Sequence, residues 1–265
     1  MNRTLEETAR AIFKSWFVDF DPVRGTAAIR DEIRCLFPDG LVDSPIGPIP
    51  EGWAVAPLGE QVEVTRGLSY TGDELGDEGM PLHNLNSVLE GGGYKYDGIK
   101  YYTGEYRERD LVRPGDVIVA ATEQGFEHLL IGYPAVVPRL FGDEGLYSQD
   151  LSRVRPAKGS PFTSRFIYLL FVGFRMHHTI AGYSNGTTVN HLAPEGLCKP
   201  LIAVPPSELV ASFDEVVGPM FDQQESLVAE SQTLGDLRDA LLPKLISGEF
   251  RLDNLPTSPS DVDDE

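Results

Sequence analysis

The C-terminal part of the chain carries one long amphipathic pattern. From residue 207 to about residue 247, apolar side chains recur at steps of three and four, with acidic and polar side chains between them. The pattern predicts a helix of roughly 35 residues, about 50 Å long at 1.5 Å per residue, which Gly218-Pro219 should kink or begin. Such a helix is longer than a domain of ordinary size needs to cover its sheet. Its natural partner is therefore another long helix, in a coiled coil or a bundle.

A second, shorter helix is expected near the N-terminus, over residues 4–17. Its apolar side chains form one stripe, and a helix of this length is marginal alone, so it must pack against something. It is either an ordinary domain helix or one half of a helix pair. The residues expected to form helix or subunit interfaces are Leu5, Ile12, Phe13, Trp16 and Phe17 in this helix, and Leu227, Leu234, Leu237, Leu241 and Leu245 in the long one.

The region between the two helices differs in character. Residues 38–52 contain four prolines and read as an extended linker. Short apolar runs at 62–65, 117–121, 131–137 and 201–204 predict strands, and the apolar segment 163–180 predicts a buried helix. We therefore expect a mixed α/β domain flanked by a short and a long helix. The expected division is a helix and extension at 1–37, a linker at 38–52, the α/β domain at 53–206, a long helix at 207–250 and an acidic disordered tail at 251–265.

Charge and composition restrict the class of protein. The 265 residues include 22 Lys and Arg against 41 Asp and Glu, a formal net charge of −19, which argues against a nucleic-acid partner. Locally the balance differs, because residues 107–199 hold ten basic and nine acidic side chains. No apolar run approaches the roughly 18 residues of a membrane span, and no secretory signal is apparent, so a cytoplasmic location is expected. Cys35 and Cys198 match no zinc or redox spacing and are expected to stay reduced.

The glycine cluster and the histidines of the chain match no catalytic motif. Gly91-Gly92-Gly93 lacks the Lys-Ser/Thr ending of a phosphate loop and is better explained as a flexible turn. His177 and His178 are adjacent, so on a helix they point about 100° apart and do not share one metal easily. A methyltransferase would need a cofactor loop and an Asn/Asp-Pro-Pro-aromatic motif, and neither is present. We expect no catalytic residue, no metal and no cofactor bound by this chain.

Three segments resemble the specificity subunits of type I restriction-modification systems. These segments are LEETARAIFKSWFVDFDPVR at 5–24, IPEGW at 49–53 followed by PLG at 57–59, and LRDALLPKLISG at 237–248. Between them, GDVI at 115–118, SQD at 148–150 and GTTVNHL at 186–192 follow in the family's order. The resemblance extends over nearly the whole chain apart from the acidic tail.

The resemblance implies a reader of double-stranded DNA that is not itself a catalyst. Such subunits usually carry two recognition domains, separated by two long helices in an antiparallel coiled coil. The helices dock modification subunits, which methylate adenine with S-adenosylmethionine, and restriction subunits, which use ATP and Mg²⁺. This chain has only one recognition domain and so resembles a half-size subunit, which would pair with itself or with another half. The alternatives are a protein-interaction adaptor that does not read DNA and a silent recombination cassette.

Residues that contact DNA are expected in polar turns, where Arg, Lys, Asn, Gln and Tyr match base edges and phosphates. The candidates are Arg66, Tyr70, Arg107, Arg109, Gln124, Tyr183, Asn185, Thr187, Thr188 and His191. A substitution that neutralises Arg107 and Arg109 should weaken DNA binding and reduce its salt dependence.

Overall fold

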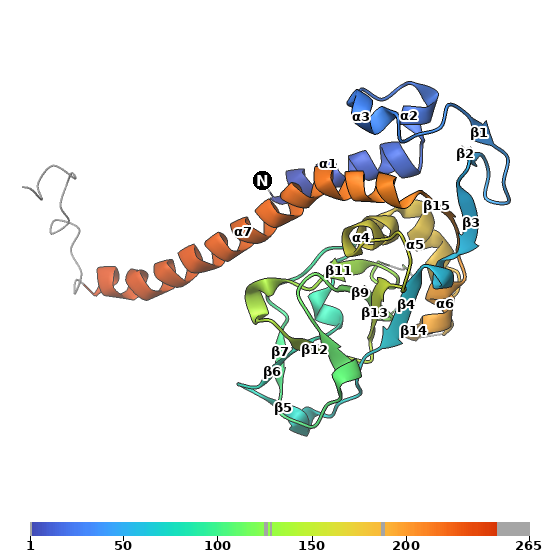
Figure 1. Cartoon of the computed structure of the whole chain (residues 1–265). Coiled ribbons are helices and arrows are strands. Elements are labelled where there is room, and N and C mark those ends of the chain that lie inside the picture. The colour runs from blue at the N-terminus through green and yellow to red at the C-terminus, as the bar shows by residue number, and fades with distance from the viewer. Residues whose placement is uncertain (1, 125–126, 128, 187–188, 248–265) are drawn as a thin grey trace, which may run out of the picture.

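The structure is a computed structural model that describes residues 2–124, 127, 129–186 and 189–247. A mixed α/β body packs against helix α1 and the first part of a long helix, α7, which extends away from the body (Figure 1). The helices are α1 (Asn2–Phe17), α2 (Asp21–Arg24), α3 (Asp31–Arg34), α4 (Ser164–Val172), α5 (Phe174–Ala181), α6 (Pro194–Cys198) and α7 (Ser207–Ile246). The expected fold class, with a short N-terminal and a long C-terminal helix, is confirmed.

A four-stranded antiparallel sheet forms the centre of the body, in the order β11-β9-β13-β4. Its strands are β4 (Val62–Arg66), β9 (Val117–Ala120), β11 (Pro134–Val136) and β13 (Leu151–Pro156). All four residues of β9 are buried, which fits a strand covered on both faces. The strands predicted at 62–65 and 117–121 are confirmed, whereas β11 begins only at Pro134 because Leu130–Tyr133 forms a turn.

A five-stranded sheet in the order β5-β7-β6-β12-β8 lies beside it. Its strands are short: β5 (Leu75–Gly76), β6 (Met80–His83), β7 (Lys100–Tyr102), β8 (Leu111–Val112) and β12 (Gly145–Tyr147). Three two-stranded ribbons complete the body: β1 (Leu41–Val42) with β2 (Ile49–Pro50), β3 (Ala54–Pro57) with β15 (Leu201–Val204), and β10 (Thr122–Gln124) with β14 (Val189–His191). The proline-rich segment is therefore not simply extended, because β1 and β2 form a hairpin within it and Ile49 is buried.

Aromatic side chains join α1 and α7 to the body. Phe17 of α1 contacts Phe166 of α4 and Phe213 of α7, with ring centroids 4.9 and 5.0 Å apart. Trp16 lies 5.7 Å from Phe213, and Phe13 lies 5.1 Å from Phe166. Of the interface residues expected on α1, Phe13, Trp16 and Phe17 lie in the main core and Ile12 packs against it, whereas Leu5 is only partly buried.

Two expectations about helices are corrected. The segment 163–180 forms two helices rather than one, because Gly173 has an extended backbone (φ −61°, ψ 130°) between α4 and α5. The long helix does not start at Gly218-Pro219, since α7 begins at Ser207 and runs through both residues. Its distal half exposes Leu234, Leu237, Leu241 and Leu245, whereas Leu227 is partly buried. The expected acidic tail at 251–265 lies outside the described residues.

Candidate nucleic-acid interface

The ribbon β10–β14 brings together two of the segments expected to contact DNA. Its register opposes Gln124 to Val189 and Thr122 to His191. The backbone N–H of Asn185 donates to the carbonyl of His191 at 2.9 Å, and the His191 N–H donates back at 2.8 Å. Gln124, Asn185 and His191 are therefore held close together, although they are up to 67 positions apart in the chain. The candidates Thr187 and Thr188, between Asn185 and His191, lie outside the described residues.

Arg66 reaches the same end of the central sheet through the turn before β13. Its Nε donates to the carbonyl of Gln149 at 2.9 Å, and its side chain is exposed. The next residue, Asp150, accepts a hydrogen bond from Thr122 Oγ1 at 3.2 Å. The structure thus connects Arg66 to β10 and, through β10, to His191.

Tyr70 follows Arg66 and contacts a lysine that no sequence motif singles out. The Nζ of Lys100, in β7, donates to the Tyr70 hydroxyl at 3.3 Å and lies 5.6 Å from the centre of its ring. Tyr183 forms a similar pair, because Lys199 Nζ lies 5.2 Å from its ring centre. Both lysines add positive charge beside candidate tyrosines. Their positions depend on contacts between distant segments, so the sequence offers no local signal for them.

Arg107 and Arg109 lie on another part of the body. Arg107 directly precedes the 3₁₀ turn η4 (Glu108–Asp110), and Arg109 lies within it. This turn leads into β8, an edge strand of the five-stranded sheet. The Asp110 carboxylate accepts from the Arg107 backbone N–H at 3.0 Å and lies 3.6 Å from Arg109 Nε. Both arginine side chains are exposed. They do not belong to the group formed by Arg66, Gln124, Asn185 and His191.

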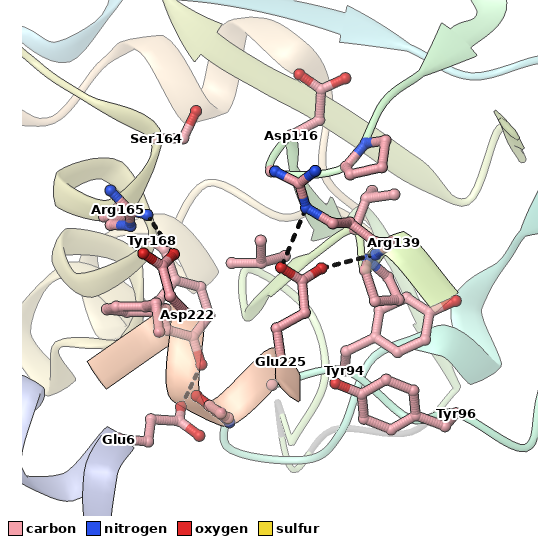
Figure 2. Close-up of a pocket in the computed structure, with 18 of the residues that line it drawn as sticks. Glu6, Tyr94, Tyr96, Asp116, Arg139, Ser164, Arg165, Tyr168, Asp222 and Glu225 are labelled. Atoms are coloured by element: carbon pink, nitrogen blue, oxygen red, sulfur yellow. Dashed lines mark hydrogen bonds and ion pairs between the residues drawn. The ribbon is translucent and has the colours of Figure 1, made fainter. Parts of the chain in front are cut away.

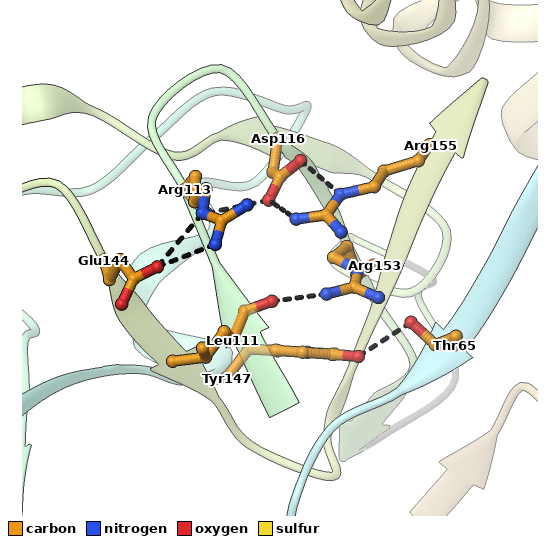
Figure 3. Close-up of polar contacts among 8 residues, drawn as sticks. All are labelled: Thr65, Leu111, Arg113, Asp116, Glu144, Tyr147, Arg153 and Arg155. Carbon is orange, nitrogen blue, oxygen red and sulfur yellow. Dashed lines mark hydrogen bonds and ion pairs between the residues drawn. The ribbon is translucent and has the colours of Figure 1, made fainter. Parts of the chain in front are cut away.

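Several other basic side chains are engaged within the body, as Figure 3 shows. Arg155 donates two hydrogen bonds to Asp116, at 2.7 and 2.5 Å, and these bonds raise the pKa of Arg155. Arg153 is buried, donates to the Leu111 carbonyl and stands over the Tyr147 ring. Arg113 pairs with Glu144 at 2.8 Å. The ten basic residues counted over 107–199 therefore overstate the charge that is free to meet phosphates.

A cavity of about 430 Å³ lies where the body meets α1 and α7 (Figure 2). Its walls are joined by ion pairs: Arg165 to Asp222 at 2.9 Å and Arg139 to Glu225 at 3.4 Å. The Tyr168 hydroxyl donates to Glu6, and burial raises the pKa of Tyr168, so the hydroxyl stays protonated. Acidic groups here are thus matched with donors from the opposite wall. This arrangement fixes the junction between the body and the two helices.

Two further observations concern other kinds of site. Among the described residues, no three His, Cys, Asp or Glu side chains are gathered as a metal ion would require. Within the same part of the chain, no helix combines the length and apolar character needed to cross a membrane. Cys35 and Cys198 are not joined in a disulfide.

The curated proteins that this chain resembles in sequence are named as specificity subunits of type I restriction enzymes. The chain is 25% identical over 268 residues to the type I restriction enzyme MjaIX specificity subunit of Methanocaldococcus jannaschii, covering 96% of this chain and 55% of that protein. It is 23% identical over 303 residues to the HindI specificity subunit of Haemophilus influenzae, covering 94% and 62%. The chain thus spans little more than half the length of these relatives. No protein-family model matches it.

A solved structure shows the same fold. The S subunit of a type I restriction-modification system from M. genitalium aligns with 74% of this chain and 46% of its own, at 18% identity and a TM-score of 0.50. The likeness therefore concerns the fold, and the aligned part is about half of that chain.

Proposed function

The chain is homologous to type I restriction enzyme specificity subunits over about half of their length, and from this premise we propose that it recognises DNA sequence without being a catalyst. The recognition body would read one half of a bipartite target. The helices would dock the modification and restriction subunits, and S-adenosylmethionine, ATP and Mg²⁺ would be bound by those partners.

The observation that carries the proposal is the β10–β14 ribbon with its surroundings. It gathers Gln124, Asn185 and His191 at the end of the central sheet to which Arg66 also belongs. Arg is suited to phosphate oxygens and guanine edges, and Asn and Gln to adenine edges. One surface thus offers both kinds of contact that sequence recognition needs.

The exposed leucines of α7 support a pairing of two recognition bodies. Leu234 and Leu237 are 59% and 52% exposed, and Leu241, Leu242, Leu245 and Ile246 continue the apolar surface. Burial of such a stripe against a second copy, or against another half-length subunit, would remove it from water. A two-fold pair would present two bodies and read an inverted repeat with a fixed gap.

The net charge of −19 bears on affinity. With so few free basic side chains, the isolated chain should bind DNA weakly. Affinity is expected to arise mainly in the complex with modification subunits.

The test is co-expression with type I modification subunits, followed by genome-wide mapping of methylated adenines. A methylated motif with two half-sites and a fixed gap, absent when this chain is omitted, supports the proposal. If no methylation depends on the chain, the adaptor or silent-cassette alternative is favoured.

A further inference from the structure

Glu123 is a buried acidic residue in the middle of β10. Only 5% of its surface is exposed, and in the ribbon it stands opposite Asn190 of β14. A buried carboxylate is stable only when its oxygens accept strong hydrogen bonds. The partners of Glu123 therefore indicate what the residue does.

Three consecutive backbone N–H groups donate to this carboxylate. Leu129 donates to Oε1 at 2.7 Å, while Leu130 and Ile131 donate to Oε2 at 3.3 and 3.0 Å. Successive amides around an anion form a concave binding site for negative charge. Here the anion is a side chain of the same domain, so the site serves to hold two segments together.

Residues 129–131, which donate to Glu123, are themselves held in the body by burial and hydrogen bonds. Ile131 is fully buried, and the next residue, Gly132, donates its N–H to the Ala120 carbonyl at 2.8 Å. Leu129 accepts a hydrogen bond from the Gly91 N–H at 3.3 Å. Residues 129–132 thus form a fixed base to which β10 is tied through one side chain.

The ribbon needs such a tie because it is small. Strands β10 and β14 have three residues each, and the sheet that they form has no other described strand. A two-stranded ribbon alone is marginal in water. Gln124 directly follows Glu123, and His191 and Asn185 depend on the partner strand.

We propose that Glu123 is a positioning residue for DNA reading: its carboxylate fixes the β10–β14 ribbon and thereby the placement of Gln124, Asn185 and His191. The inference rests on the proposed function. It assigns no DNA contact to Glu123, which acts only through the ribbon.

The test compares Glu123→Gln with Glu127→Gln in the full chain assembled with modification subunits. Both substitutions remove one negative charge from neighbouring positions, but Glu127 is exposed. Hydrogen exchange followed by mass spectrometry measures the amides of residues 129–131 and 189–191. We expect exchange there to be at least tenfold faster in Glu123→Gln and unchanged in Glu127→Gln, with the amides of α4 unaffected in both.

DNA binding provides the second measurement. For the duplex that carries the mapped methylation target, we expect Glu123→Gln to raise Kd at least tenfold, with little change for a scrambled duplex. A general loss of structure would instead weaken binding to both duplexes. Glu123→Asp keeps the negative charge on a shorter side chain, so it should retain the fold. Its amide exchange rates and its Kd for the target duplex should lie between those of the unsubstituted chain and Glu123→Gln.

Two results would overturn the inference. One is unchanged exchange at residues 129–131 in both Glu123 variants. The other is faster amide exchange in the Glu123 variants together with a ratio of Kd values for target and scrambled DNA that equals the ratio for Glu127→Gln. If the unsubstituted chain directs no methylation, the proposed function fails, and with it the role of Glu123 in reading. If the unsubstituted chain directs methylation but the Glu123 variants match the control, the inference alone fails.

Discussion

The ring of Phe17 stands edge-on to the ring of Phe213, with their centroids 5.0 Å apart and their planes at 88°. This contact joins the first helix of the chain to the last. Phe166 of α4 lies 4.9 Å from the same Phe17 ring, so three helices meet at one aromatic cluster. The orientation of α7 relative to the body is fixed at this cluster and at the ion pairs of the neighbouring cavity.

The first prediction concerns Phe213, which is fully buried in this cluster. Phe213→Ala should lower the free energy of unfolding by about 3–5 kcal/mol, because it removes a large apolar side chain and leaves a cavity among four other aromatic rings. Urea denaturation followed by tryptophan fluorescence measures the change. Gln232→Ala, on the exposed distal part of α7 and on the side opposite Leu241, is the control and should change stability by less than about 0.5 kcal/mol. Similar losses in both variants would contradict the central role of the cluster.

The elements that the sequence predicts well are those with a strong local pattern. Helix α7 was expected from 207 to about 247 and runs to Ile246, because its apolar spacing persists over many turns. Strand β9 is a continuous apolar run, and it lies at the centre of the sheet. The break at Gly173 was missed because the apolar character continues through it, and only the backbone shows the division.

The candidate interface was predictable only in part. Arg66 and His191 were expected in polar turns, but Arg66 is the last residue of β4 and His191 the last residue of β14. The ribbon that brings His191 beside Gln124 and Asn185 depends on pairing between residues about 65 positions apart. The five-stranded sheet was missed for a related reason: strands of two to four residues are too short to show alternation. The burial of Arg153, and the engagement of Arg155 by Asp116, likewise depend on neighbours that are distant in the chain.

The second prediction concerns His83, whose Nδ1 lies 2.7 Å from the Tyr94 hydroxyl. Burial lowers the pKa of His83 from 6.5 to about 4, so the folded protein resists its protonation. In the unfolded chain the ring takes up a proton below pH 6.5, which stabilises the unfolded state as the pH falls. The contribution of His83 is therefore complete above about pH 7 and decreases between pH 6.5 and 4, by about 3 kcal/mol in total.

The measurement is the free energy of unfolding at several pH values for the unsubstituted chain and for His83→Gln. Glutamine keeps a hydrogen-bonding group but does not titrate, so the difference between the two proteins cancels the contribution of the carboxylates. We expect that difference to change between pH 6.5 and 4 in favour of the variant. A difference that is independent of pH would show that His83 does not carry this effect.

The third prediction concerns the exposed leucines of α7 and rests on the proposed pairing. Leu237→Glu with Leu241→Glu should dissociate the pair, because charges would replace apolar side chains at its contact. Light scattering after size exclusion should show the mass falling to that of one chain. Gln232→Glu is the control: nine positions before Leu241, it lies on the opposite side of the helix and should leave the mass unchanged. A single-chain mass for the unsubstituted protein at micromolar concentration would contradict the pairing.

The last prediction concerns Arg107 and Arg109, which lie apart from the ribbon at the edge of the five-stranded sheet. If both guanidinium groups meet phosphates, Arg107→Gln with Arg109→Gln should weaken DNA binding by the assembled methyltransferase and lower the slope of log K against log salt by about 1.8, since each lost phosphate contact contributes about 0.9. Binding titrations at several salt concentrations measure this slope. Lys158→Gln is the control. Lys158 is exposed and comes just after the end of β13, whereas the Gln149 turn comes just before its start, so the substitution should leave the slope unchanged. Equal slopes for the double variant and the unsubstituted complex would exclude these arginines from the DNA contact, and the interface would then be confined to the surface around Arg66 and the β10–β14 ribbon.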